Sequence, residues 1–178
     1  DIASGKVIGH EVLARFVDSQ GAATSAGHIF VDKRISEPEL LAYDRSVRMQ
    51  ALQRFAEAGQ PGFLTLNISP RWIDLLDDDL IPTIQMLELY KVAPEKIVIE
   101  IVETRSNAEK LLQIVRRYKA LGMRVAVDDF GSGCSQFDRV IQLEPDIVKL
   151  DMHLFKQAMK GGFPQDIVRS LSFLAERM

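Results

Sequence analysis

The sequence predicts an α/β protein built on parallel strands, and three observations support this fold class. Five short runs are rich in Val, Ile, Leu and Phe, at residues 7–17, 63–68, 97–102, 124–128 and 147–150. Longer segments with apolar residues at helical spacing lie between them. Polar residues stand at or near the end of each run, where parallel α/β folds build their sites. Alternating strands and helices are typical of parallel strands joined by right-handed crossovers, but the pattern alone leaves an open sheet and a barrel as alternatives.

The helical segments are residues 39–58, 74–90, 107–121 and 164–178. The first carries apolar side chains near helical spacing and is followed by Gly59, a common helix terminator. The third begins at Asn107, a residue type that favours helix N-termini, and ends before Gly122. Both segments therefore have start or stop signals as well as periodicity.

Composition narrows the class of protein. A chain of 178 residues that is 47% hydrophobic and 26% charged can form one globular domain. Its net charge of −3 predicts no general attraction to DNA, RNA or anionic membranes. The single cysteine, Cys134, excludes an internal disulfide and favours a reducing, cytoplasmic compartment. No apolar run approaches the roughly 20 residues of a membrane-spanning helix, so a membrane anchor would have to lie elsewhere.

The polar residues at the strand ends are the candidate site. They are Glu11 and Arg15 in the first run, Asn67 in the second, Glu100 and Glu103 in the third, Asp128 and Asp129 after the fourth, and Lys149 and Asp151 in the fifth. Gathering several ionised carboxylates is costly unless a cation or another partner compensates them. Oxygen ligands without a Cys or His cluster favour Mg²⁺ or Mn²⁺, with Ca²⁺ as a non-productive occupant.

The adjacent pair Asp128 and Asp129 could serve two metal ions. Two ions about 3.5 to 4 Å apart would activate a water and stabilise both oxygens of an in-line phosphodiester displacement. Lys149 would supply positive charge beside that water. We expect Asp151, two positions later, to lie on the same strand face, where it would orient the lysine or contact substrate.

Five motifs carry a family resemblance: Glu-Val-Leu-Ala-Arg from residue 11, Leu-Asn-Ile-Ser-Pro from 66, Glu-Ile-Val-Glu from 100, Asp-Asp-Phe-Gly-Ser-Gly from 128 and Lys-Leu-Asp from 149. In this order and approximate spacing they resemble the EAL family. The resemblance implies a TIM-like (β/α) barrel, incomplete in this chain. It also implies a metal-dependent phosphodiesterase that hydrolyses the bacterial second messenger cyclic di-GMP to linear pGpG in signal transduction.

The resemblance assigns a role to each residue that matches the family's motifs. The implied metal ligands are Glu11, Asn67, Glu100, Asp128 and Asp129, which would hold Mg²⁺ or Mn²⁺ in a two-metal site that Ca²⁺ inhibits. Lys149, Glu11 and Asp128 match catalytic positions, and Arg15, Leu13 and Asp151 match substrate-binding positions. Glu103 matches a glutamate that anchors the loop after Asp128 and Asp129 and couples metal occupancy to dimerisation. A homodimer fused to sensor or other signalling domains is expected.

Several departures from the family pattern bear on activity. Residues 1–178 are expected to form a single EAL-like domain that lacks the family's first strand and its last strands and helices, including the later Glu-Gly-Val-Glu and Gln-Gly segments. Residues 18–38 lack the usual Phe-Ile-Pro signature, and Cys134-Ser135-Gln136-Phe137 replaces a segment in which two serines and a leucine are commoner. The alternatives are therefore a catalytically inactive cyclic di-GMP receptor or a protein-interaction module.

Four of the assigned residues have simpler structural explanations. Asn67 could cap the turn before Pro70, and Glu103 and Asp151 could each cap the helix that follows. Arg15 could pair with a nearby acid.

Overall fold

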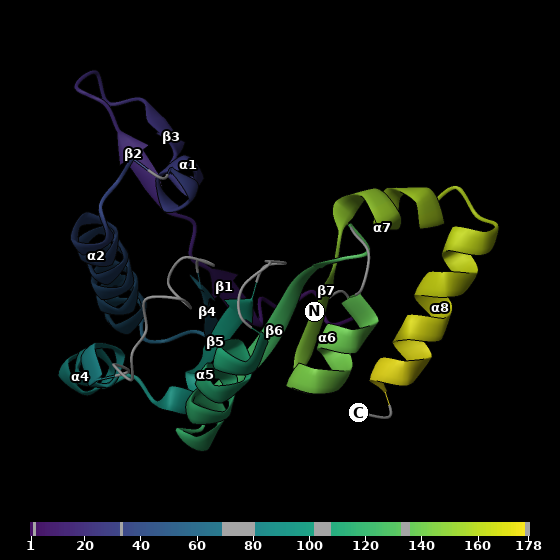
Figure 1. Cartoon of the computed structure of the whole chain (residues 1–178). Coiled ribbons are helices and arrows are strands. Elements are labelled where there is room, and N and C mark those ends of the chain that lie inside the picture. Colours follow the sequence, from purple (N-terminus) through teal and green to yellow (C-terminus); the bar gives the residue numbers. More distant parts are fainter. Residues whose placement is uncertain (2, 33, 69–80, 102–107, 133–135, 177–178) are drawn as a thin grey trace.

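The computed structural model describes the chain except for residues 2, 33, 69–80, 102–107, 133–135 and 177–178. Five strands form a parallel sheet in the order β1-β4-β5-β6-β7, which curls into half of a barrel (Figure 1). The strands are β1 (Gly9–Glu11), β4 (Phe63–Ile68), β5 (Ile97–Ile101), β6 (Arg124–Phe130) and β7 (Ile147–Leu150). The prediction of an α/β fold with parallel strands is confirmed.

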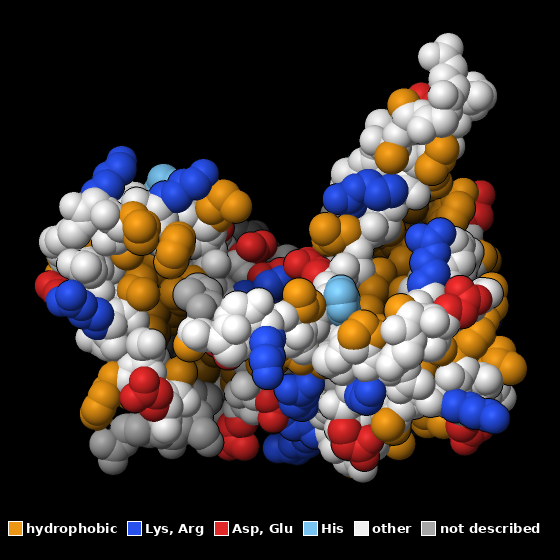
Figure 2. Space-filling model, turned by 180° about the vertical axis from the view of Figure 1, so that it is seen from behind, with side chains coloured by type: hydrophobic (Ala, Val, Ile, Leu, Met, Phe, Trp, Pro, Cys, Tyr) orange, Lys and Arg blue, Asp and Glu red, His pale blue; other side chains and the backbone are white. Residues whose placement is uncertain are grey.

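A small lobe follows β1, carries the second sheet and projects from the rest of the molecule (Figure 1 and Figure 2). Strands β2 (Arg15–Val17) and β3 (Ala23–Ser25) pair antiparallel, and α1 (Gly27–Val31) follows them. The prediction of one continuous strand over residues 7–17 is therefore wrong. The backbone N–H of Val12 donates to the carbonyl oxygen of Thr65 on β4, and the chain then continues into a hairpin whose turn is held by the Asp18 carboxylate.

Helices connect the strands of the sheet, and two more follow the last strand β7 (Figure 1). They are α2 (Glu37–Glu57), α4 (Ile81–Tyr90), α5 (Ala108–Ala120), α6 (Gln136–Leu143), α7 (Met152–Ala158) and α8 (Phe163–Ala175), with the 3-10 turn η1 (Pro94–Lys96) before β5. Helix α2 begins two residues before its predicted start because Ser36 and Glu39 form a capping box. The short helices α6 and α7 were not predicted. No helix among the described residues is both long and apolar enough to cross a membrane.

The main core lies between the sheet and the helices α2, α4 and α5. Alternate strand positions such as Leu66, Ile99 and Val127 pack against helix residues such as Leu52 and Tyr118. Because side chains alternate along a strand, the intervening positions share the opposite face. Asn67, Glu100 and Ala126 are register neighbours across β4, β5 and β6. The polar residues near the carboxyl ends of the strands are thereby brought together on that face.

Candidate metal centre

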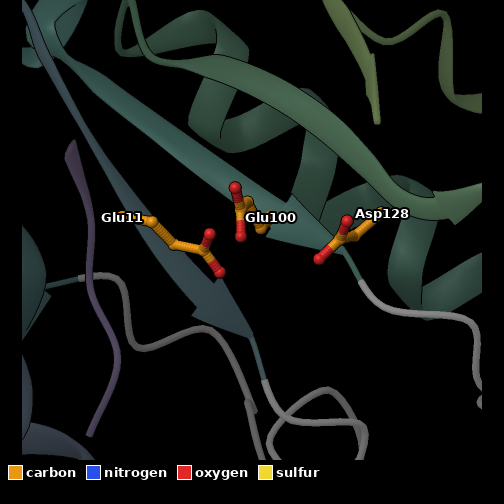
Figure 3. A group of neighbouring side chains, drawn as sticks. All are labelled: Glu11, Glu100 and Asp128. Carbon is orange, nitrogen blue, oxygen red and sulfur yellow. The ribbon is translucent and has the colours of Figure 1, made fainter. Parts of the chain in front are cut away.

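Three carboxylates converge at the carboxyl ends of the strands (Figure 3). One ligand oxygen from each of Glu11, Glu100 and Asp128 lies within 4.8 Å of the other two. Glu100 on the central strand β5 is only 1% exposed, whereas the side chains of Asp128 and Glu11 are 18% and 39% exposed. The group is therefore buried at one end and open to solvent at the other, as an accessible ion site requires.

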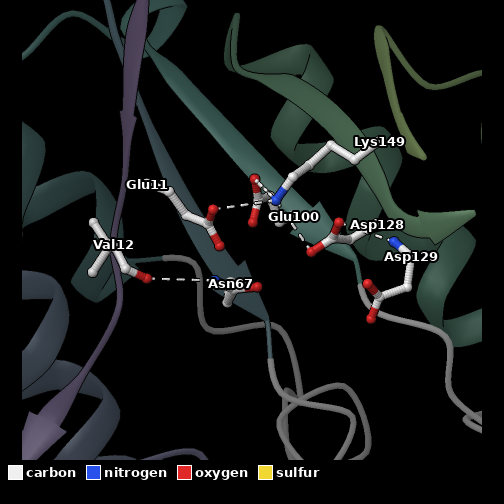
Figure 4. A network of polar contacts seen from close by, with 7 residues as sticks. All are labelled: Glu11, Val12, Asn67, Glu100, Asp128, Asp129 and Lys149. Carbon is white, nitrogen blue, oxygen red and sulfur yellow. Dashed lines mark hydrogen bonds and ion pairs between the residues drawn. The ribbon is translucent and has the colours of Figure 1, made fainter. Parts of the chain in front are cut away.

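Lys149 projects from β7 into this group (Figure 4). Its Nζ lies 2.9 Å from Glu100 Oε1, 3.2 Å from Asp128 Oδ2 and 3.5 Å from Glu11 Oε2. Burial lowers the pKa of the Lys149 ammonium, but the hydrogen bonds and charges of Glu100 and Asp128 outweigh burial and leave the pKa above its ordinary value. The ammonium stays protonated at neutral pH and partly neutralises the three acids.

Glu100 has one satisfied oxygen and one that lacks a partner. Its Oε1 accepts from Lys149, but its buried Oε2 has no hydrogen-bond partner within the described part of the chain. Burial raises the pKa of the Glu100 carboxyl, Lys149 opposes the increase, and the charges of Glu11 and Asp128 add to it. A buried carboxylate oxygen without a donor, beside two further acids, is a suitable ligand for a hard cation.

Asn67 and Asp129 border the three-carboxylate group. Asn67 is the register neighbour of Glu100, and its amide nitrogen donates to Val12 O over 3.4 Å, which leaves the amide oxygen as a potential ligand. Asp129 has a φ of 54° in the left-handed region, its backbone N–H donates to Asp128 Oδ1 over 2.9 Å, and its carboxylate lies beyond Asp128 at the edge of the group (Figure 4). Burial raises the pKa of Asp129, and the charges of Asp128 and Asp151 add to the increase.

The residues predicted to contact substrate are more dispersed. Leu13 is exposed between β1 and the hairpin, and Arg15 is exposed at the start of β2, where its Nη1 donates to the carbonyl of Ala14 over 2.9 Å. Glu103 lies outside the described residues. The structure brings together Glu11, Glu100, Asp128 and Lys149, with Asn67 and Asp129 beside them.

Asp151 requires a correction. It does not continue the strand that carries Lys149, because β7 ends at Leu150 and Asp151 is the N-cap of α7. Its Oδ1 accepts from the backbone N–H groups of His153, at 2.7 Å, and Leu154, at 3.3 Å. The alternative explanation of Asp151 as a helix cap is thus confirmed.

The loop after β6 packs closely against α7. Gly131 has a φ of +104°, and a Cβ at this position would come within 2.5 Å of Leu154 Cδ2. Only glycine fits this approach without a shift. The position of Asp128 and Asp129 is therefore coupled to the helix that Asp151 caps.

One buried polar pair near the site was not found by the sequence reasoning. Asp44 and Arg48 form an ion pair on α2, and Arg48 Nη2 donates to the carbonyl oxygen of Asn67 over 3.2 Å. The signal was present, because Asp44 and Arg48 continue the four-residue spacing of the apolar positions Leu40 and Leu52. Charged residues within an apolar helix stripe indicate a buried pair rather than a solvated face.

The donor set fits a hard divalent cation, since every candidate ligand is a carboxylate or amide oxygen. Glu11, Glu100 and Asp128 would form the centre, and Asn67 and Asp129 would extend it.

Comparisons with known proteins agree with this geometry. The family model described as EAL domain matches residues 1–178. The chain is 30% identical over 161 residues to the cyclic di-GMP phosphodiesterase RocR of Pseudomonas aeruginosa. The alignment covers 88% of this chain and 40% of RocR. It spans less than half of that relative.

Two solved structures share the fold. The crystal structure of Bacillus subtilis YkuI in complex with substrate c-di-GMP and calcium has 30% identity and a TM-score of 0.79, and covers 96% of this chain and 43% of YkuI. The c-di-GMP bound form of a standalone EAL protein from Vibrio cholerae O395 has 26% identity and a TM-score of 0.83, and covers 98% of this chain and 72% of that protein. Together with the five-stranded half-barrel described above, these similarities confirm the TIM-like fold, incomplete in this chain.

Proposed function

This chain belongs to the EAL domain family, and we propose that it is part of a metal-dependent phosphodiesterase that hydrolyses cyclic di-GMP to linear pGpG. The observation that carries the proposal is the convergence of Glu11, Glu100 and Asp128 around Lys149. Three acids and a lysine at one end of a half-barrel suit phosphodiester hydrolysis, which needs both a cation site and a fixed positive charge. The relative RocR is named as a cyclic di-GMP phosphodiesterase, which supports the same substrate.

The metal ligands in this proposal are Glu11, Asn67, Glu100, Asp128 and Asp129. When bound, Mg²⁺ or Mn²⁺ would supply an activated water and charge stabilisation for the attacking and leaving oxygens. Glu100 fixes the buried end of the centre, and its Oε2 has no hydrogen-bond donor among the described residues. Glu11 and Asp128 are more exposed and border the side from which a substrate phosphate enters.

Lys149 acts in this proposal as a hydrogen-bond donor and fixed charge beside the water. In the metal-free chain, Glu100 and Asp128 raise the pKa of Lys149, so the side chain is a cationic hydrogen-bond donor at neutral pH. An ammonium has three N–H donors, which lets Lys149 orient an oxygen nucleophile while it retains contact with a carboxylate. Glu11 and Asp128 hold the ammonium from two strands, β1 and β6.

We assign substrate contacts to Arg15, Leu13 and Asp151. Arg15 is exposed and its guanidinium can bind a phosphate bidentately. Leu13 is 55% exposed and offers an apolar surface to a base. Asp151 uses Oδ1 as a helix cap, and Oδ2 is the oxygen that we assign to the substrate.

Further properties are proposed from the family resemblance. Glu103 would anchor the loop after β6, and the protein would form a homodimer fused to sensor or other signalling domains in the cytoplasm. Calcium accompanies c-di-GMP in the YkuI crystal structure, and we propose that Ca²⁺ occupies the centre here without supporting turnover.

A cyclic di-GMP receptor without turnover is the second candidate. The contacts of Lys149 with Glu11, Glu100 and Asp128 favour it, because the lysine already compensates part of the acidic charge. Such a domain could bind the nucleotide through Arg15 without a metal.

Nucleotide turnover distinguishes the two candidates. The full-length protein is incubated with cyclic di-GMP and Mg²⁺ or Mn²⁺, with and without chelator, and the nucleotides are separated chromatographically. Metal-dependent formation of linear pGpG is expected, and Asp128→Asn should abolish most of it without unfolding the protein. Binding without product would support the receptor, and wild-type turnover by Asp128→Asn would refute the assigned centre.

A further inference from the structure

A buried ion pair on α2 lies behind the candidate metal centre, on the helix side of the sheet. Asp44 and Arg48 are one helical turn apart, and Arg48 Nε donates to Asp44 Oδ2 over 2.5 Å. The two residues are 5% and 2% exposed, within a helix stripe that also buries Leu40 and Leu52. Burial lowers the pKa of Arg48, but the charge of Asp44 outweighs it and the guanidinium remains protonated.

Arg48 extends from this pair to the end of β4. Its Nη2 donates to the carbonyl oxygen of Asn67 over 3.2 Å. The side chain of Asn67 donates in turn to the carbonyl of Val12, just after β1. Asn67 is thus held from two directions, through its backbone by α2 and through its amide by the segment that follows Glu11.

We propose that Arg48, oriented by Asp44, is a positioning residue that fixes the end of β4 so that Asn67 stays beside Glu100. The inference rests on the proposed function, in which Asn67 and Glu100 bind the cation. Asn67 is the register neighbour of Glu100, so a shift of the β4 backbone at this residue would move the amide relative to the carboxylate. A charge-assisted hydrogen bond from a desolvated guanidinium resists such a shift more strongly than a neutral donor would.

Stability alone does not account for this arrangement. Replacing a buried ion pair by apolar residues of similar size is often neutral or stabilising, because desolvation offsets the attraction between the charges. The contact with Asn67 is what an apolar pair at these positions could not provide. The hydrogen bond from Arg48 to Asn67 is therefore a role of the pair at the candidate centre that its contribution to stability does not explain.

The test uses a double variant that removes the pair without leaving a buried charge. Asp44→Leu combined with Arg48→Met keeps approximate volume and eliminates the donor to Asn67. Either substitution alone would leave an uncompensated buried charge and unfold part of the protein. The matched control is Leu52→Ala, one turn further along α2, which opens a cavity in the same core but removes no hydrogen-bond donor to Asn67.

Two measurements on the full-length protein separate positioning from folding. Hydrogen exchange of residues 63–68 in the metal-free protein should become faster in the double variant while its Tm stays near that of the wild type. Mn²⁺ affinity, measured by electron paramagnetic resonance, should fall by about tenfold, as expected when the support of a ligand is removed. Leu52→Ala should lower Tm but leave Mn²⁺ affinity unchanged.

The outcomes are distinguishable. If the double variant bound Mn²⁺ as tightly as the wild type, or if Leu52→Ala weakened binding equally, the role of Arg48 would be overturned while the centre stood. If the wild type itself bound no Mn²⁺, the proposed centre would fail, and the inference would fail with it.

Discussion

Replacing Glu100 by Gln separates charge from packing at the buried end of the site. Two repulsions would be relieved, between Glu100 and the carboxylates of Glu11 and Asp128, whose oxygens lie within 4.8 Å. At an effective dielectric constant of about 20, each is worth roughly 3.5 kcal/mol, together about 7 kcal/mol. One attraction would be lost, to Lys149 at 2.9 Å, worth about 6 kcal/mol on the same scale. The charge–charge terms nearly cancel, and the substitution also relieves the cost of burying the charge, which raises the pKa of Glu100.

Glu100→Gln should therefore not destabilise the metal-free protein and should stabilise it at neutral pH by on the order of 1 kcal/mol, whereas Mn²⁺ affinity should fall by about a hundredfold. Stability is measured by chemical denaturation monitored by circular dichroism, and affinity by calorimetric Mn²⁺ titration. Glu88→Gln, at an exposed position of α4, is the matched control and should change neither quantity. Wild-type Mn²⁺ affinity in Glu100→Gln would refute the placement of the cation at this carboxylate.

The pH dependence supplies an independent readout. Burial, opposed in part by Lys149, raises the pKa of Glu100 above its ordinary 4.5 in the folded protein. The folded state then binds this proton more tightly than the unfolded state, so the contribution of Glu100 to stability is most favourable below pH 4.5 and declines as pH rises through the folded pKa. Glu100→Gln should lack this decline in the metal-free protein, and an unchanged pH profile would contradict the assigned burial effect.

Three further predictions follow from the same geometry. Lys149→Ala should lower kcat more than it raises KM, and it should lower the Tm of the metal-free protein in a way that Mg²⁺ reverses, since three carboxylates lose their cation. Asp151→Ala should lower the free energy of unfolding by about 1 kcal/mol, because α7 loses its N-cap. Asp151→Ser keeps a capping oxygen and should restore stability, but it should bind cyclic di-GMP more weakly in calorimetry if the carboxylate also contacts substrate. Gly131→Ala should lower the free energy of unfolding, measured by denaturant titration, by roughly 1 to 3 kcal/mol or more, because backbone strain at φ +104° adds to the clash of the new Cβ with Leu154. Gly21→Ala is the control: this residue has a φ of +84° with open space around it, so the substitution should show the backbone strain alone.

The elements that sequence reasoning located well are those with strong patterns. The bounds of β4 and β7 coincide with the predicted runs 63–68 and 147–150, because apolar runs flanked by Gly, Pro or Asp leave a clear signal. The run 7–17 was misjudged because β1 and β2 have only three residues each and mostly exposed side chains, so their apolar residues show no alternation that marks a break. The helices α6 and α7 are short, which weakens their periodic pattern. The N-cap of α7 is Asp151, and in the sequence this residue is equally consistent with an acid at the end of the preceding strand.

The candidate site was predictable to the extent that it depends on strand register. Parallel strands align their carboxyl ends, so the strand positions of Glu11, Glu100 and Asp128 sufficed to expect their convergence. The contact of Arg48 with Asn67 was not predictable in the same way, because it joins a helix and a strand end 19 residues apart. Sequence spacing shows that Asp44 and Arg48 share a helix face, but only packing decides which carbonyl the guanidinium meets.

The structure also changes the reason for expecting a metal. From the sequence, the gathering of carboxylates demanded a cation, but Lys149 already provides one, so the acids can converge in the folded chain before any ion binds. The stronger reason to expect a metal is the Glu100 oxygen that Lys149 does not contact. This atom, Oε2, is buried without a hydrogen-bond donor among the residues described. A cation that binds this oxygen would compete with Lys149 for the same acids and release its N–H donors toward the substrate. Metal binding and the availability of Lys149 are therefore expected to be coupled through Glu100.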